Sequence, residues 1–80
     1  MKLEDLSAEE LAMLADCVRA AALRCIAPPG RVIMQTMLIG SHQQILMNGR
    51  ILIEKLRSNF PGDTHPIRLV ELYLKLVEAL

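Results

Sequence analysis

Few residues of this chain could bind a metal or form a nucleophile–base pair: the candidates are Cys17, Cys25, His42 and His65. Structural zinc sites use closely spaced Cys and His pairs, whereas the nearest two of these residues are eight positions apart. No carboxylate lies at helical spacing from either histidine, and the sequence contains no glycine-rich phosphate loop. We therefore predict no metal site, no cofactor, no catalytic residues and no enzymatic activity. The two cysteines are interpreted as small buried thiols.

A second group of polar residues lies in an apolar setting. Residues 32–49 carry no formally charged side chain, and the polar members of that segment include Ser41, His42, Gln43, Gln44 and Asn48. Uncharged polar side chains on an apolar helix can form a buried layer that fixes register or partner choice. In that case His42 is a hydrogen-bonded core or interface residue. The other interpretation is that the amides point into solvent, and the sequence leaves both open.

The same segment offers one alternative function, which is DNA binding by a transcriptional regulator. When residues 35–54 are placed on a helix-turn-helix template with Gly40 in the turn, the polar residues 42–44 begin the recognition helix and could read base edges. Few other template positions fit. The first basic residue of that helix is Arg50, which leaves little phosphate anchoring. We expect nucleic-acid binding to be weak or absent.

Composition indicates which elements position these residues. The chain has 80 residues, of which 52% are apolar, and its only aromatic side chains are Phe60 and Tyr73. A supply of Leu, Ile, Val, Met and Ala without Trp is typical of packed helices, so we predict a single all-α domain over residues 1–80. A domain this small cannot hide so much apolar surface alone, which favours an oligomer.

Charge is balanced overall but divided along the chain. Residues 1–16 contain one base and five acids, a net of −4, and residues 17–57 contain six bases and one acid, a net of +5. We expect the acidic start to pair with the basic middle, within one chain or across a dimer. The uncharged segment holds seven polar residues and does not fit a membrane span. Without a Cys-x-x-Cys motif or a secretory signal, a cytoplasmic location is expected.

Capping signals and prolines predict the first helix. Ser7 and Glu10 form a capping-box pattern, in which each residue bonds the backbone of the other. The Pro28-Pro29-Gly30 segment then ends the helical pattern, because proline cannot donate the backbone hydrogen bond of a helix interior. The predicted helix covers residues 7–26. Its apolar stripe is Leu11, Leu14, Val18, Ala21 (with Ala22) and Cys25.

The middle of the chain predicts two helices, near 31–39 and 42–60, separated at Gly40. Ser41 and Gln44 repeat the capping-box pattern after that glycine. A seam of coiled-coil spacing supports the longer helix; its members are Ile39, His42, Leu46, Gly49, Ile53, Leu56 and Phe60. Four further apolar residues widen that face: Met34, Leu38, Ile45 and Leu52. One continuous helix over 31–60 is an alternative. A hairpin at Asn48-Gly49 is another, although neither flank of that dipeptide alternates as a half-buried strand would.

The last helix is predicted over residues 66–80, with Asp63 or Thr64 as its cap. This helix is apolar on two faces, and a helix that is apolar nearly all round is buried on both sides. We therefore predict a three- or four-helix bundle, completed by dimerisation, in which one of those faces meets a second copy. The predicted dimer interface is Leu69, Leu72, Leu76 and Leu80.

A helical protein with surplus apolar surface and no chemistry is best explained as an interaction module. We expect a small homodimer that binds and regulates another protein, as bacterial and phage inhibitors, anti-activators, adaptors or chaperones of this general build do. The uncharged middle offers apolar side chains on more than one face with basic residues at its rim, a distribution typical of interfaces. The predicted partner-binding residues are Met34, Met37, Met47, Arg50, Ile51, Lys55 and Arg57.

Overall fold

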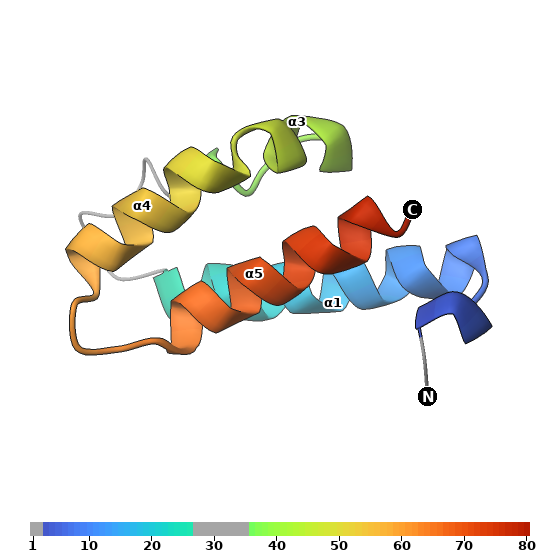
Figure 1. Cartoon of the computed structure of the whole chain (residues 1–80), viewed down its shortest axis with the longest axis horizontal. Coiled ribbons are helices and arrows are strands. Elements are labelled where there is room, and N and C mark those ends of the chain that lie inside the picture. The colour runs from blue at the N-terminus through green and yellow to red at the C-terminus, as the bar shows by residue number, and fades with distance from the viewer. Residues whose placement is uncertain (1–2, 27–35) are drawn as a thin grey trace.

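The computed structural model of the chain describes residues 3–26 and 36–80, and within these ranges every regular element is helical (Figure 1). The prediction of an all-α fold is confirmed for this part of the chain. The elements are a short 3₁₀ helix η1 (Leu3–Asp5), α1 (Ala8–Ile26), α3 (His42–Met47), α4 (Gly49–Asn59) and α5 (His65–Glu78). The Pro28-Pro29-Gly30 stop, most of the predicted helix 31–39, and Met34 lie outside the described residues.

Helix α5 is the central element of the fold. It runs antiparallel to α1 on one side and packs against α3 and α4 on the other, and its most extensive contact is with α1 (Figure 1). This position accounts for much of its apolar surface, which other helices of the same chain cover, although Leu72 remains 45% exposed. The buried residues of α5 are Pro66, Ile67, Val70, Tyr73, Leu76 and Val77.

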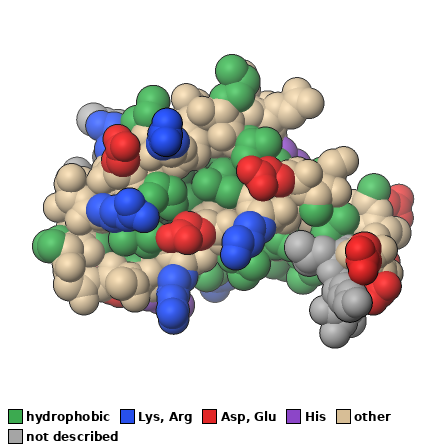
Figure 2. Space-filling view, viewed as in Figure 1, with side chains coloured by type: hydrophobic (Ala, Val, Ile, Leu, Met, Phe, Trp, Pro, Cys, Tyr) green, Lys and Arg blue, Asp and Glu red, His purple; other side chains and the backbone are tan. Residues whose placement is uncertain are grey.

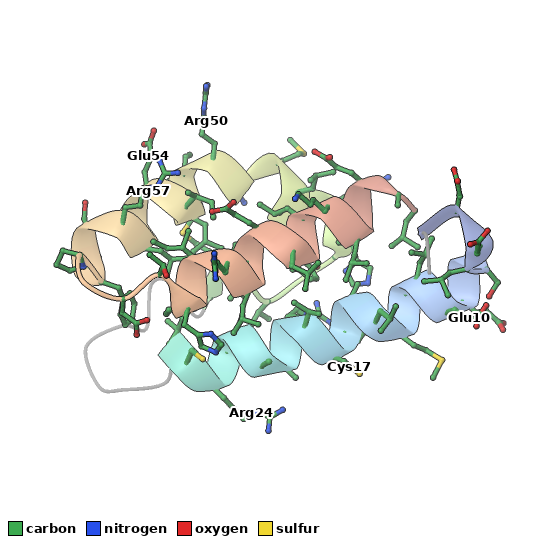
Figure 3. All side chains as sticks on the ribbon, turned by 60° about the horizontal axis from the view of Figure 1, so that its bottom comes forward. Glu10, Cys17, Arg24, Arg50, Glu54 and Arg57 are labelled. Atoms are coloured by element: carbon green, nitrogen blue, oxygen red, sulfur yellow. The ribbon has the colours of Figure 1, made fainter. Side chains whose placement is uncertain are left out.

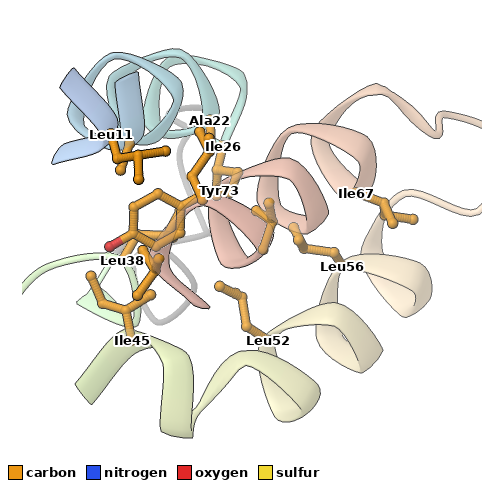
Figure 4. Packing of buried hydrophobic residues seen from close by; sticks show 13 residues of the cluster. Leu11, Ala22, Ile26, Leu38, Ile45, Leu52, Leu56, Ile67 and Tyr73 are labelled. Atoms are coloured by element: carbon orange, nitrogen blue, oxygen red, sulfur yellow. The ribbon is translucent and has the colours of Figure 1, made fainter. Parts of the chain in front are cut away.

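The hydrophobic core lies along both sides of α5 (Figure 4). On α1 its members are Leu11, Ala15, Ala22 and Ile26. The predicted stripe of that helix is therefore confirmed at Leu11 and Ala22 but not elsewhere: Leu14 is partly exposed, Cys25 is half-buried, and the fully enclosed Ala15 was not predicted. Small alanine side chains let the backbones of two helices approach closely, and the large side chains of α5 then fill the space between them. The prediction of buried thiols also fails at Cys17, which is exposed.

Both predicted capping boxes are present. The Ser7 N–H donates to Glu10 Oε1 at 2.9 Å, and the Glu10 N–H donates to Ser7 Oγ at 3.1 Å. Ser41 and Gln44 repeat this exchange at 3.4 and 3.2 Å at the start of α3. Gly40 precedes that cap with φ of 123°, a conformation that glycine adopts without a Cβ penalty. These signals need only residues three apart, which is why they could be predicted.

The segment predicted as one helix over 42–60 is divided into α3 and α4 at Asn48. The Asn48 N–H still donates to the Gln44 carbonyl at 3.2 Å, and the Leu52 N–H donates to the Asn48 carbonyl at 3.0 Å. Helical hydrogen bonding therefore flanks the break on both sides, and no hairpin forms at Asn48-Gly49. The helix predicted over 31–39 does not reach residue 39, because residues 37–40 form turns and bends.

The predicted apolar face of the middle segment is confirmed in part. Its buried line is Ile45, Gly49, Leu52 and Leu56, of which Gly49 and Leu56 belong to the predicted seam and the other two to the residues that widen it. The remaining seam residues lie at the edge: Ile39 is largely exposed, and His42, Leu46, Ile53 and Phe60 are only partly buried. Gly49 lies against the Leu74 side chain of α5, where an added Cβ would stand 2.8 Å from Leu74 Cδ1. The glycine thus provides a close approach between α4 and α5.

Helix α5 begins one residue earlier than predicted, with Pro66 in its first turn. The Asp63 carboxylate accepts a hydrogen bond from the His65 N–H at 3.0 Å, so Asp63 supplies the side-chain cap. Thr64 makes no such bond with its side chain. None of the helices in the described ranges is long and apolar enough to cross a membrane.

Candidate functional site

A polar cluster joins three helices at the edge of the core. His42 begins α3, and its Nδ1 lies 2.6 Å from the hydroxyl oxygen of Tyr73 on α5. The other ring nitrogen, Nε2, lies 3.6 Å from Asp16 Oδ1 on α1. Asp16 is also bonded by Arg19 at 2.9 Å. Arg19 in turn donates to the carbonyl of Gly40 at 3.2 Å, so the cluster anchors the start of α3 to α1 and α5.

Tyr73 is the buried member of this cluster. Its residue has no solvent exposure, and burial raises the pKa of its phenol above the ordinary value of 10.0. The Asp16 carboxylate adds to that rise, whereas the Arg19 guanidinium opposes it. A buried hydroxyl without a partner would carry a desolvation cost of about 1–3 kcal/mol. We therefore interpret the cluster as structural: its hydrogen bonds satisfy the buried hydroxyl and hold the start of α3 against α1 and α5.

The polar residues of the middle segment divide between the two interpretations. His42 belongs to a partly buried polar layer, while Gln43, Gln44 and Asn48 are exposed. Gln44 uses its side chain in the α3 cap. No three His, Cys, Asp or Glu side chains gather closely enough to hold a metal ion anywhere in the described ranges.

The outward side of α3 and α4 carries the second candidate site. Met47 is 83% exposed and Ile51, four residues later, is 51% exposed. Residues four apart on a helix are neighbours on its surface, and helical hydrogen bonding flanks Asn48 between them. Arg50, Lys55 and Arg57 are also exposed on α4. Figure 3 shows Arg50 and Arg57 projecting from α4 on the side away from α1.

The structure brings most of the predicted partner-binding residues to one surface. Met47, Arg50, Ile51, Lys55 and Arg57 all lie exposed on α3 and α4. Met37 does not join them, because it is half-buried and packs against the core. Met34 lies outside the described residues.

Two shallow hollows beside α4 extend this surface toward α5, one of about 380 Å³ and one of about 410 Å³. Arg57 lines both, so the hollows adjoin. The first also contains Arg50 and Glu54, and the second contains Arg68 and Glu71 of α5. In Figure 2, basic and acidic side chains alternate across the face formed by α4 and α5, with hydrophobic side chains between them. The contribution of Arg68 was not predicted, because it depends on how α5 packs beside α4.

The predicted dimer residues do not share one exposed face. Leu76 is only 3% exposed and belongs to the core, and Leu69 is half-buried against it. Leu72 and Leu80 are partly exposed. The available part of that predicted interface is therefore limited to these two leucines, which lie about two helical turns apart.

No protein-family model, curated protein or solved structure matches this chain.

Proposed function

We propose that this protein is a non-catalytic module that binds and regulates another protein through the outward side of α3 and α4, and that it acts in the cytoplasm as a homodimer. The observation that carries the proposal is the pairing of Met47 and Ile51, two exposed apolar side chains framed by arginine and lysine. Apolar anchors surrounded by polar residues are the usual arrangement of binding energy in a protein interface. Methionine also adapts its shape to a partner.

The charges of this surface indicate the chemistry of the partner. Arg50, Lys55 and Arg57 contribute three positive charges and Glu54 one negative charge, a local net of +2. The adjoining hollow adds Arg68 with Glu71. A partner segment with an apolar side chain at its centre and acidic residues at its edge would complement this surface. The basic rim would then steer the encounter and set its salt dependence.

The DNA-binding alternative is supported by no specific observation. Two of the three residues placed to read bases already have partners inside the chain, since His42 contacts Tyr73 and Gln44 caps α3. The first turn of α3 contains no basic residue. The Met47–Ile51 surface instead offers exposed apolar side chains and basic residues, which suit a protein partner.

The proposal is tested by capturing partners from the native host, identifying them by mass spectrometry, and titrating the purified partner against variants. Met47→Asp and Ile51→Asp should each weaken binding at least tenfold while leaving the circular dichroism spectrum unchanged. Ile39→Asp, which places the same charge on an isoleucine that is 65% exposed and lies outside the proposed surface, is the matched control and should bind as tightly as the wild type. Full-strength binding by the double variant Met47→Asp/Ile51→Asp would overturn the proposal.

The basic rim is tested separately by Arg57→Glu. This variant should lower the association rate of the identified partner more at low salt than at high salt, because exposed charges are screened by ions. The dissociation rate should change little. An association rate equal to that of the wild-type protein at every salt concentration would show that Arg57 takes no part in the interface.

A further inference from the structure

The outward side of α1 carries an apolar stripe that no element of the described structure covers. Met13 is 68% exposed, Leu14 is partly exposed, and Cys17 and Ala20 are exposed beside them. A shallow hollow of about 360 Å³ lies on this side, and its lining is almost entirely apolar apart from Glu10. The core face of α1, formed by Ala15 and Ala22, points the opposite way toward α5.

Charged side chains mark both ends of this stripe. Glu10 and Arg24 are exposed and lie seven residues before and seven residues after Cys17. Seven residues are close to two helical turns, so the three side chains lie on one line of the helix. Figure 3 shows Glu10, Cys17 and Arg24 along the same side of α1, away from α5. The stripe thus has a negative end, an apolar centre and a positive end.

A second copy of the same stripe, turned antiparallel, complements it at each position. With a two-fold axis at Cys17, Glu10 faces the partner's Arg24 and Arg24 faces the partner's Glu10. Because this operation keeps each side chain on the same edge of the contact, Met13 lies nearest the partner's Ala20 and Leu14 nearest the partner's Ala21. Large side chains therefore meet small ones, as close packing requires. Opposite charges meet at both ends, and the two helix dipoles run in opposite directions.

We propose that α1 forms the homodimer interface, through an antiparallel contact with α1 of a second copy in which Cys17 lies at the two-fold axis. The symmetry makes the surface self-complementary, which an isologous dimer needs. This inference rests on the homodimer of the proposed function but not on the partner-binding surface of α3 and α4. That surface is on the opposite side of α5 from α1 (Figure 1).

The charge pattern gives a test in which two defective variants repair each other. Glu10→Lys places a base at both ends of the stripe, and Arg24→Glu places an acid at both ends. Each variant alone should therefore repel its own copies. In an equimolar mixture, the lysine introduced at position 10 of one chain meets the glutamate introduced at position 24 of the other. At the opposite end, the unchanged Arg24 of the first chain meets the unchanged Glu10 of the second.

Sedimentation equilibrium at micromolar concentration should give about twice the 8.9 kDa of one chain for the wild-type protein and for the mixture. Each variant alone should give a mass near that of one chain. Circular dichroism checks that each variant remains helical, because Glu10→Lys also removes a capping acceptor. A mixture that stays monomeric, or single variants that dimerise as strongly as the wild type, would overturn the proposal.

Cysteine crosslinking tests the position of the axis with a second readout. Copper phenanthroline accepts the electrons of two thiols as they join, and a disulfide requires Cα atoms about 4.4–6.8 Å apart. Cys25→Ser, which leaves only Cys17, should be captured as a covalent dimer as fast as the wild type. Cys17→Ser, the matched control, should give at least tenfold slower crosslinking. Equal rates for the two variants would contradict an axis at Cys17.

Failure of this inference can be distinguished from failure of the proposed function. Met13→Asp should leave the protein folded, abolish the dimer and preserve each partner-binding site. Met47→Asp should leave the dimer intact and lose the partner. A folded Met13→Asp variant that remains fully dimeric would place the dimer interface elsewhere while leaving the α3–α4 proposal untouched.

Discussion

The Nδ1 atom of His42 and the hydroxyl oxygen of Tyr73 lie 2.6 Å apart and join residues 31 positions apart in the sequence. Their rings are tilted by 50°, with centroids 5.7 Å apart. Tyr73 is enclosed between helices, and α3 presents His42 to its hydroxyl at that point. The contact links the first residue of α3 to the middle of the central helix, so it stabilises the position of the whole α3–α4 segment.

A double-mutant cycle should measure this link. Tyr73→Phe removes the hydroxyl and His42→Phe removes its partner, and each change should lower the free energy of unfolding by about 1 kcal/mol. The double variant should lose less than the sum, because the two residues share one interaction. Urea unfolding followed by circular dichroism gives the four values. Strict additivity within about 0.3 kcal/mol would show that the two residues are not coupled.

Tyr73 should also make the fold sensitive to alkaline pH. Burial raises the pKa of its phenol in the folded chain above the ordinary value of 10.0. The unfolded chain therefore releases this proton at a lower pH than the folded chain does, and ionisation favours unfolding. The contribution of the neutral phenol is fully present below pH 10 and is lost as the pH rises through the folded-state pKa.

This shift can be measured directly, because Tyr73 is the only tyrosine and the chain has no tryptophan. The ultraviolet absorbance of tyrosinate should rise at a higher pH in the folded protein than in the urea-unfolded protein. Tyr73→Phe should remove the corresponding part of the alkaline loss of stability. Identical titration curves for the folded and unfolded chains would show that burial does not raise the pKa of Tyr73.

Gly49 is the first residue of α4, and we expect its lack of a side chain to matter for packing against α5. Replacing glycine with alanine in a helix normally gains up to about 1 kcal/mol, but a Cβ here would stand 2.8 Å from Leu74 Cδ1. We expect Gly49→Ala to lower the free energy of unfolding by about 1 kcal/mol, because overpacking outweighs the helical gain. Leu74→Ala opens the space. In that background Gly49→Ala should therefore be neutral or stabilising, and an equal loss in both backgrounds would exclude the Leu74 contact as the cause.

The sequence predicted what depends on near neighbours. The two capping boxes, at Ser7–Glu10 and Ser41–Gln44, follow from the side chain and backbone of residues three apart. Gly40 was assigned correctly as a break for the same reason, since its conformation at φ of 123° is local. The broad helix boundaries then follow from these signals and from Pro66 in the first turn of α5.

The sequence predicted the buried face of each helix only in part. Hydrophobicity alone favours Leu14 over Ala15 as a core residue, but the close approach of α1 to α5 encloses the alanine and leaves the leucine at the edge. The partner of Tyr73 could not be predicted either, because it comes from a distant helix. Among the predicted partner-binding residues, Met47 and Ile51 are exposed because they lie opposite the buried line of their helices, whereas Met37, in the turn before Gly40, is half-buried.

Leu72 and Leu76 should respond differently to an introduced charge. The sequence predicted both in one dimer interface, but the structure exposes one and buries the other. Leu76 is 3% exposed inside the chain, while Leu72 is 45% exposed on α5. Leu76→Glu should unfold the protein, since burying an unpaired charge costs several kcal/mol. Leu72→Glu should remain folded, because its carboxylate can reach water.

The oligomeric state of the Leu72→Glu variant then decides between two dimer surfaces. If α1 forms the interface, this variant should sediment at the mass of the wild-type dimer, because its new charge lies on a different helix. If α5 forms the interface, the same charge should dissociate the dimer while leaving the helical spectrum intact. A folded, monomeric Leu72→Glu protein would thus favour the α5 surface over the α1 contact, and a folded dimer would exclude Leu72 from the interface.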